Sequence, residues 1–286
     1  MTEDIEPTAV DGVPTPGDVP TLGDMPMLGF GTWELDDPSE AVEAVSTALD
    51  VGFRHVDTAQ AYDNENAVGD AIEESPVDRD EIYLATKIWI DNLDYETAKE
   101  STYESLDRLD TDYVDLLYVH WPAGEYDPDG TLQALDELVT EGAVENLGVA
   151  NFEPDQLETA VLGTEAEITA HQFEYHPLLR QDRMLDVCEE HDVHPVAYSP
   201  LARGNVEEVP TITDIAAENA VSAAQVSLAW LRQRGIAAIP KATSEAHIHD
   251  DWESLTLRLS ESEMAELDDI EQFERQVDPS FAPWNS

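Results

Sequence analysis

Basic residues are scarce in this sequence. Its 286 residues include 13 Lys and Arg against 64 Asp and Glu, which gives a formal net charge of −51. Nucleic-acid binding requires a cationic surface, so this composition excludes it. Self-repulsion on this scale destabilises a compact chain in dilute salt, whereas molar salt shortens the Debye length to about 3 Å. Because 42% of the residues are hydrophobic, we expect a folded, salt-loving (halophilic) protein rather than a disordered chain.

Cysteine and long apolar runs are scarce too. The single Cys188 excludes an intramolecular disulfide, and we expect a small buried thiol there. The chain has no apolar run of about 18 residues that would span a membrane. Its N-terminal stretch also lacks the basic and apolar regions of a signal peptide. We therefore expect a cytoplasmic protein with no membrane partner.

Residues 1–20 are acidic and rich in proline and glycine, and we expect them to form a flexible arm. From residue 21 to residue 286, short β-branched runs alternate with amphipathic stretches, without a linker-like break, which predicts a single domain. Strands are expected at 27–33, 55–58, 82–87, 114–120, 147–149, 169–172, 195–198 and 236–240. Helices are expected at 38–51, 65–74, 95–109, 131–141, 154–162, 182–191, 211–234 with a break near 220–222, 244–254 and 260–273.

The alternation amounts to about eight strand–helix repeats, the number in a (β/α)₈ TIM barrel. A doubly wound open sheet is the alternative fold. Gly29 and Gly31 do not form a dinucleotide-binding fingerprint, because Glu34 occupies the place of the third glycine in G-x-G-x-x-G.

Reactive side chains fall at the ends of the predicted strands. Asp57, Lys87 and His120 end three of them, and Tyr62 lies in the loop after Asp57. Catalytic groups of barrel enzymes come from the C-terminal ends of strands, so these four side chains are expected on one face. Further polar residues end or follow later strands: Asn151, Gln172, Tyr198 and Lys241.

The four groups form a coherent acid–base unit. A free tyrosine has a pKa near ~10, and a lysine ammonium about 4 Å away would lower it toward ~7, a value suited to proton transfer at neutral pH. Asp57 would keep Lys87 charged, and His120 could donate a hydrogen bond to a substrate oxygen. The predicted reaction is protonation of a carbonyl oxygen by Tyr62. The alternatives are a structural Asp57–Lys87 ion pair and a core histidine at position 120.

The sequence resembles the aldo-keto reductases from about residue 27 to residue 251. The matching pieces are LGFGTW (28–33), GFRHVDTAQAYDNE (52–65), TKIW (86–89), DLLYVHWP (115–122), GVANF (148–152), QFEYHP (172–177), AYSPLARG (197–204) and IPKAT (239–243). The resemblance implies hydride transfer from a nicotinamide to a carbonyl carbon, with a catalytic tetrad of Asp57, Tyr62, Lys87 and His120. The short LARG loop is more similar to the prokaryotic branch, which includes 2,5-diketo-gluconate reductases. The resemblance also favours a monomer.

The resemblance further implies where a cofactor would bind. Tyr198 would stack on the nicotinamide, and Asn151 and Gln172 would hold its carboxamide. Ala150 departs from the serine usual in the family and removes one hydrogen bond, at a cost of about 1 kcal/mol. The other contacts expected along the cofactor channel are Gly31, Thr32, Ser199, Leu201, Arg203, Lys241, Thr243 and His247.

The adenosine end departs more strongly from the family pattern. Lys241 keeps one cation for a 2′-phosphate, whereas His247 replaces an arginine and Asp250 and Asp251 add negative charge nearby. Because salt screens that charge and Arg203 can assist, we expect NADPH, with NADH or dual use as the alternative.

Other interpretations of these residues remain possible at this stage. Trp33, Trp89 and Trp121 could wall a pocket for a small-molecule carbonyl substrate or could simply pack between loops. A non-catalytic NADP(H)-binding sensor on the same fold is the second functional hypothesis. A metal-dependent barrel hydrolase is the third, although the histidine pairs 247/249 and 171/176 lack the spacing of a metal site, so no metal is expected.

Overall fold

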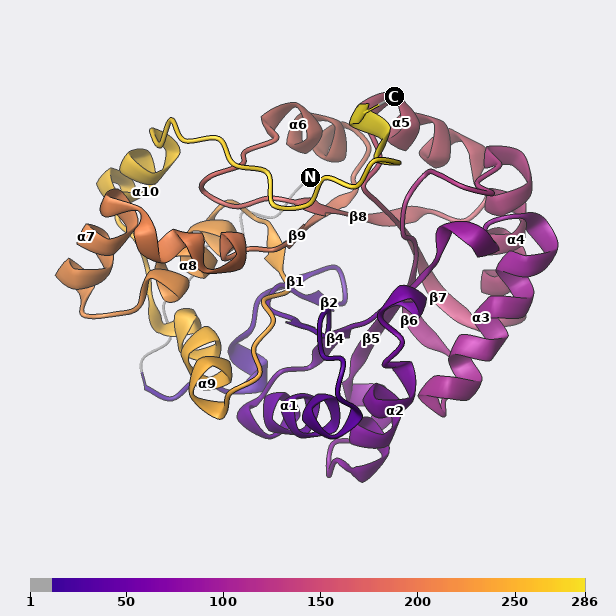
Figure 1. Cartoon of the computed structure of the whole chain (residues 1–286), viewed down its shortest axis with the longest axis horizontal. Coiled ribbons are helices and arrows are strands. Elements are labelled where there is room, and N and C mark those ends of the chain that lie inside the picture. The colour runs from indigo at the N-terminus through magenta and orange to yellow at the C-terminus, as the bar shows by residue number, and fades with distance from the viewer. Residues whose placement is uncertain (1–11, 286) are drawn as a thin grey trace.

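The computed structural model describes residues 12–285. Eight parallel strands, β3 to β10, pair in the order of the chain and are surrounded by helices (Figure 1). The strands are β3 (Phe30–Gly31), β4 (His55–Asp57), β5 (Tyr83–Ile88), β6 (Val114–Val119), β7 (Val144–Ala150), β8 (Ile168–Glu174), β9 (His194–Tyr198) and β10 (Ala237–Ala238).

The sheet closes on itself through its two shortest strands. The Gly29 N–H donates to the carbonyl of Ala238 at 2.9 Å, and the Ala238 N–H donates to the carbonyl of Met27 at 2.8 Å. The Gly31 N–H continues the pairing by donating to the carbonyl of Pro240 at 2.9 Å. The fold is therefore the expected (β/α)₈ barrel and not an open doubly wound sheet.

Helices follow the strands around the outside of the barrel. Their first turns carry strong start signals, such as Asp37, whose carboxylate accepts from the N–H groups of Ser39 and Glu40 ahead of Pro38 at the first helical position. The helices are α1 (Pro38–Val51), α2 (Glu65–Glu74), α3 (Tyr95–Leu109), α4 (Pro128–Glu141), α5 (Pro154–Gly163), α6 (Asp182–Glu190), α7 (Pro210–Asn219), α8 (Ala223–Gln233), α9 (Glu245–Glu253) and α10 (Glu261–Asp268).

Strand alternation divides the core into two layers. Outward-facing residues such as Leu84, Leu117 and Val149 pack against the helices in the larger cluster. Inward-facing residues form a second, smaller cluster that includes Ala85, Leu116 and Tyr118. Because side chains of a strand alternate between the faces, Lys87 shares the inner face with Ala85, and its charge enters the barrel.

The structure describes part of the stretch expected to form a flexible arm, namely residues 12–20. Residues 1–11 lie outside the described part of the chain. Beyond them, Pro16–Asp18 forms a 3₁₀ turn, η1, and Val19 is buried in the core. A hairpin then forms from β1 (Thr21–Leu22) and β2 (Met25–Pro26), and Leu22 and Met25 belong to the inner cluster of the barrel. The chain therefore packs against the barrel from Val19 onward, while the flexible arm stays a prediction.

The last expected helix is shorter than predicted. The sequence predicts a helix over 260–273, but α10 ends at Asp268. Beyond it, the Glu274 N–H donates to the carbonyl of Leu178 at 2.8 Å, so a tertiary hydrogen bond replaces the helical one. Residues 269–282 instead run as an irregular segment past β8 and α6 (the yellow trace in Figure 1) and lead into the 3₁₀ turn η7 (Pro283–Asn285). Within residues 12–285, no helix is long and apolar enough to span a bilayer.

Candidate active site

The centre of the site is a fully buried ion pair at the C-terminal end of the barrel. Lys87 is the penultimate residue of β5 and Asp57 ends β4; their side chains are 0% and 1% exposed and form a salt bridge. The Lys87 ammonium also donates to the Thr58 carbonyl at 2.8 Å and to the Tyr62 hydroxyl at 3.3 Å. Burial alone would lower the pKa of Lys87, but Asp57 and Tyr62 together raise it, so the ammonium keeps its charge.

Tyr62 lies at the end of the 3₁₀ turn η2 (Gln60–Tyr62), directly after β4. Burial raises the pKa of its hydroxyl above the ordinary value, and Lys87 opposes that rise without overcoming it. The value near 7 expected from sequence is therefore wrong for the cofactor-free protein, because desolvation of the phenolate exceeds its attraction to Lys87. The resting group is the neutral phenol, which is the form that can donate a proton.

One amide fixes the turn that carries Tyr62. The Gln60 side-chain oxygen accepts from the Trp89 N–H at 2.9 Å and from Asn92 at 3.0 Å. Its nitrogen donates to the Ser101 carbonyl at 3.1 Å and to the Ser105 hydroxyl at 3.2 Å. Gln60 therefore joins η2 to the end of β5 and to α3.

His120 follows β6 and stands edge-to-face with both Tyr62 and Trp89, at centroid distances of 5.7 and 5.3 Å. Burial, and secondarily Lys87, lowers the pKa of His120 well below its ordinary value, so the imidazole is neutral at neutral pH. Its Nδ1 is buried without a hydrogen-bond partner among the described residues. A bare lone pair costs less there than an unsatisfied N–H, so the proton is best placed on Nε2, where it can be donated to a ligand.

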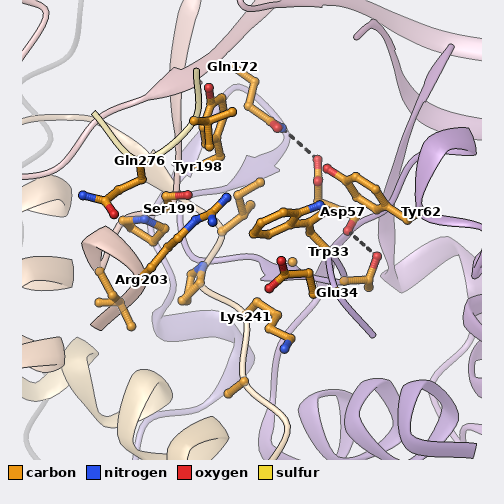
Figure 2. A pocket seen from close by; sticks show the side chains of 18 of the residues that line it. Trp33, Glu34, Asp57, Tyr62, Gln172, Tyr198, Ser199, Arg203, Lys241 and Gln276 are labelled. Atoms are coloured by element: carbon orange, nitrogen blue, oxygen red, sulfur yellow. Dashed lines mark hydrogen bonds between the residues drawn. The ribbon is translucent and has the colours of Figure 1, made fainter. Parts of the chain in front are cut away.

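Three polar residues extend this network around the barrel. The Gln172 side chain donates to the second oxygen of Asp57 at 2.8 Å (Figure 2). The Tyr198 hydroxyl donates to the Asn151 side-chain oxygen at 2.7 Å, and the Asn151 amide donates to the His120 carbonyl at 3.0 Å. Gln172 thus already supports the ion pair, and its amide oxygen remains as an acceptor for a ligand.

A cavity of about 1020 Å³ opens above these groups. It is lined at one end by Asp57, Tyr62 and His120, while Lys87 lies beneath the lining, and it continues past Arg203 and Lys241 to α9. Arg203 lies against the Trp33 ring, its guanidinium carbon 4.3 Å from the ring centroid, and Figure 2 shows the two side chains together at the cavity wall.

The chain has only 13 Lys and Arg. Two of them, Arg203 and Lys241, line this one cavity, which indicates that the cavity binds an anionic ligand. Within residues 12–285, neither Arg203 nor Lys241 takes part in a salt bridge. This donor set fits a long ligand with phosphate groups between its two ends.

Four of the nine non-glycine residues with a positive φ in the described part of the chain line the same cavity. Glu34, Asn151, Ser199 and Arg203 line it, and each has a positive φ, between 48° and 62°. Such conformations are costly for residues with a Cβ and persist where the surroundings enforce them, commonly at functional sites. The positive φ angles of Ser199 and Arg203 in the turn after β9 are therefore maintained by the surrounding structure, and they direct this turn toward the cavity.

The C-terminal segment closes the other side of the cavity. The buried Glu174 carboxylate at the end of β8 accepts from the N–H groups of Gln276 and Val277, at 2.6 and 2.9 Å. His176 lies 2.9 Å from the same carboxylate. Held in this way, the segment brings Phe281 edge-to-face against Trp89 and Trp121, at centroid distances of 5.9 and 5.4 Å.

The structure brings together nearly every residue predicted for the site. The tetrad converges, and all three predicted tryptophans and all but one of the predicted cofactor residues line the cavity. Thr243 is the exception: it is exposed and absent from the lining. The lining residues that sequence reasoning missed include residues 276–279 of the C-terminal segment, Glu34 and Ala224. Glu174, in the QFEYHP piece, was the one available signal, because a carboxylate at the end of a buried strand needs hydrogen-bond donors, and the C-terminal segment supplies them.

A (β/α)₈ barrel with a buried lysine–aspartate pair, a tyrosine and a histidine at one end of a long cavity has the arrangement of an enzyme active site. The chain belongs to the Aldo/keto reductase family, whose model matches residues 27–272. It is accordingly an oxidoreductase of carbonyl compounds.

Its relatives include bacterial reductases of small carbonyl compounds. It is 35% identical to the glyoxal reductase of Bacillus subtilis (strain 168) over 86% of this chain and 89% of that protein. It is 37% identical to the methylglyoxal reductase DkgB of Escherichia coli O157:H7 over 88% of this chain and 95% of that protein.

Solved structures agree with the fold. The structure of a candidate 2,5-diketo-D-gluconic acid reductase B superposes with a TM-score of 0.86 at 36% identity, covering 90% of this chain and 92% of that one. The proteins similar to this chain thus include prokaryotic aldo-keto reductases and a 2,5-diketo-gluconate reductase-like structure.

Proposed function

We propose that the protein reduces small aldehydes and α-dicarbonyl compounds to alcohols with NADPH, with Tyr62 as the proton donor. The observation that carries the proposal is the contact of the Tyr62 hydroxyl with the buried Lys87 ammonium, directly below the cavity. When bound, the nicotinamide supplies the hydride to the carbonyl carbon. Tyr62 gives its proton to the carbonyl oxygen, and Lys87 stabilises the phenolate that remains.

We assign further roles in binding and catalysis to the residues around Tyr62. His120, with its proton on Nε2, orients the carbonyl oxygen, and Asp57 keeps the buried Lys87 charged. Tyr198 and Asn151 would hold the nicotinamide, and Arg203 and Lys241 would hold the phosphates. The cationic pair and the screening of nearby carboxylates by salt support NADPH over NADH.

The substrate class follows from the aromatic end of the cavity and from the relatives. Trp89, Trp121 and Phe281 enclose the space above His120, which favours a compact substrate. The names of the relatives, glyoxal and methylglyoxal reductase, agree with this size. The acidic composition leads us to propose a salt-rich cytoplasm as the working medium.

The test is a panel of glyoxal, methylglyoxal, a keto-sugar and an α-keto acid, run with NADPH and with NADH in molar KCl. We expect the highest kcat/KM for a dicarbonyl with NADPH. Tyr62→Phe should lower kcat by about 10² to 10⁴ while leaving the Kd for NADPH unchanged, since a positioned general acid contributes that much. Undiminished reduction by Tyr62→Phe would overturn the mechanism. A wild type that binds NADPH yet reduces none of these compounds would favour the cofactor-binding sensor.

A further inference from the structure

The turn that carries Tyr62 has open space on both of its sides. On one side lies the large cavity, and Figure 2 shows Tyr62 at its wall beside Asp57. On the other side lies a second cavity of about 260 Å³, lined by residues of η2 and α3 that include Gln60, Ala61 and Ser101. Because η2 separates two cavities, close packing contributes little to fixing the position of the Tyr62 hydroxyl.

Hydrogen bonds fix the two ends of the loop that contains η2. The Thr58 hydroxyl donates to the Asn64 side-chain oxygen at 2.9 Å, and the Asn64 amide donates to a backbone carbonyl after β3 at 2.8 Å. Between these ends, in the structure as described, only Gln60 and Tyr62 make side-chain hydrogen bonds. The bond from Lys87 to the Tyr62 hydroxyl is long, at 3.3 Å, so it holds the hydroxyl only weakly.

The Gln60 amide makes four hydrogen bonds, of 2.9 to 3.2 Å, to the chain after β5 and to α3. A glutamine amide offers two donor hydrogens and two acceptor lone pairs, so this one is fully used. One of its partners is the Trp89 N–H, and the Trp89 ring stands edge-to-face with His120 at 5.3 Å. Gln60 therefore joins the turn that carries the acid to the wall that holds the imidazole.

We propose that Gln60 is a positioning residue for proton transfer, holding the Tyr62 hydroxyl at the distance from Lys87 and in the direction that the transfer requires. The proposal rests on the proposed function, because it takes Tyr62 as the acid. Gln60 acts through Tyr62, since it does not line the large cavity and so does not touch a substrate bound there. Proton transfer is sensitive to such geometry, and a displacement of about 1 Å lowers a rate by up to about 10²-fold.

The test replaces Gln60 by methionine, which keeps the length of the side chain and removes all four hydrogen bonds. Thr58 and Asn64 still fix the ends of the loop, and the polar second cavity admits water to the groups left without Gln60, so we expect the variant to fold. In molar KCl, kcat for glyoxal with NADPH should fall about 10- to 100-fold. The KM for glyoxal and the Kd for NADPH should change little, because Gln60 does not line the large cavity.

Gln233→Met is the matched control. The Gln233 amide also bridges two parts of the chain, donating to the Leu259 carbonyl at 3.0 Å and accepting from the Leu259 N–H at 2.7 Å. It is partly buried like Gln60, but it ends α8 and lines neither of the two cavities. Its replacement should lower the thermal unfolding midpoint, as that of Gln60 does, without lowering kcat.

Two kinetic readouts separate positioning from a general loss of stability. Combined with Tyr62→Phe, Gln60→Met should lower kcat no further, because no hydroxyl remains to be positioned. The solvent deuterium isotope effect on kcat should rise in Gln60→Met, since proton transfer then limits the rate more, and should keep the wild-type value in Gln233→Met. Ser105→Ala removes one of the four partners of Gln60, and it should reproduce this pattern on a smaller scale even if Gln60→Met does not fold.

A further readout needs neither substrate nor cofactor. The ¹⁵N shift of the Lys87 ammonium, one of only three lysines in the chain, reports its contact with the Tyr62 hydroxyl. In Gln60→Met this shift should move toward its value in Tyr62→Phe, whereas in Gln233→Met it should keep the wild-type value.

Three outcomes would overturn this inference and leave the proposed function standing. They are a loss of kcat in Gln60→Met that multiplies with the loss in Tyr62→Phe, equal losses of kcat in Gln60→Met and Gln233→Met, and an unchanged Lys87 signal in Gln60→Met. Undiminished reduction by Tyr62→Phe would instead overturn the proposed function.

Discussion

At the scale of single residues, the Asp57–Lys87 pair combines catalysis with stability. Both side chains are buried, so each charge depends on the other. We expect Lys87→Met to abolish reduction and to lower the free energy of unfolding by about 3–5 kcal/mol, since it leaves a carboxylate buried without its cation. Urea denaturation in molar KCl measures the change.

The double variant Asp57→Asn/Lys87→Met provides the control for this prediction. It removes both charges, so it should recover part of the stability lost in Lys87→Met while remaining inactive. If the double variant were less stable than Lys87→Met alone, the loss would have to come from packing and not from the unpaired charge.

The residues of the tetrad could be predicted from the sequence because each ends a strand or follows one closely, and a barrel brings strand ends together. Their pKa values could not. The sequence gives the partner of Tyr62, but not the burial that outweighs it. The same limit applies at Asp251, which counts as a negative charge in the sequence and is held largely neutral at pH 7 by its surroundings.

At the scale of elements, Glu174 controls where the C-terminal segment lies. Its two oxygens accept two backbone N–H groups of that segment. Glu174→Gln keeps one acceptor and turns an N–H₂ donor toward an N–H, so a buried donor loses its partner at about 1–3 kcal/mol. We expect the KM for a small dicarbonyl to rise about tenfold, the Kd for NADPH to stay constant, and proteolysis within residues 274–285 to accelerate.

Glu271→Gln is the matched control for this effect. Glu271 is exposed on the same segment, so removing its charge should change neither the KM nor the proteolysis rate. A normal KM together with faster proteolysis in Glu174→Gln would mean that the segment is anchored as described but does not shape the substrate site.

Sequence reasoning fails most often for elements whose ends are determined by contacts with residues far away in the chain. The break near 220–222 was predictable and is confirmed by the end of α7 at Asn219 and the start of α8 at Ala223. By contrast, the helical pattern continues past Asp268, while the chain leaves the helix to hydrogen-bond near Leu178, some ninety residues away in the sequence. The local hydrophobic periodicity of a sequence cannot predict a hydrogen-bond partner so far away in the chain.

At the scale of the whole molecule, buried neutral histidines should make the protein sensitive to acid. Burial lowers the pKa of His55, His120 and His171, the last to about 3. The unfolded chain binds these protons below about pH 6.5, while the folded protein does not, so stability falls as the pH falls, by about 1.4 kcal/mol per pH unit for each histidine. Unfolding by urea between pH 6.5 and pH 5 measures this slope.

Substitution of one buried histidine separates this effect from protonation of carboxylates. His171→Gln should remove one histidine's share of the slope, whereas His249→Gln, at an exposed position, should leave it unchanged. Equal slopes in wild type and His171→Gln would contradict the assignment.

The whole molecule carries a large excess of negative charge. Several of its few cations are drawn inward: Lys87 is fully buried, Arg232 is 6% exposed, and Lys99 and Arg234 are partly buried in ion pairs. The surface therefore carries most of the excess of 51 negative charges with little local compensation. We expect this repulsion to destabilise the folded state until salt shortens its range from about 10 Å at 0.1 M to about 3 Å at 1 M.

We therefore expect the thermal unfolding midpoint to rise steeply with KCl up to about 1 M, where screening is nearly complete, and more slowly above it. Sucrose separates the two ways in which a solute can stabilise the fold, because it is excluded from protein surfaces but does not screen charge. It should give only the slow gain and should fail to restore activity in dilute buffer. If sucrose replaced KCl fully, preferential exclusion rather than electrostatic screening would maintain the fold, and the acidic surface would need another explanation.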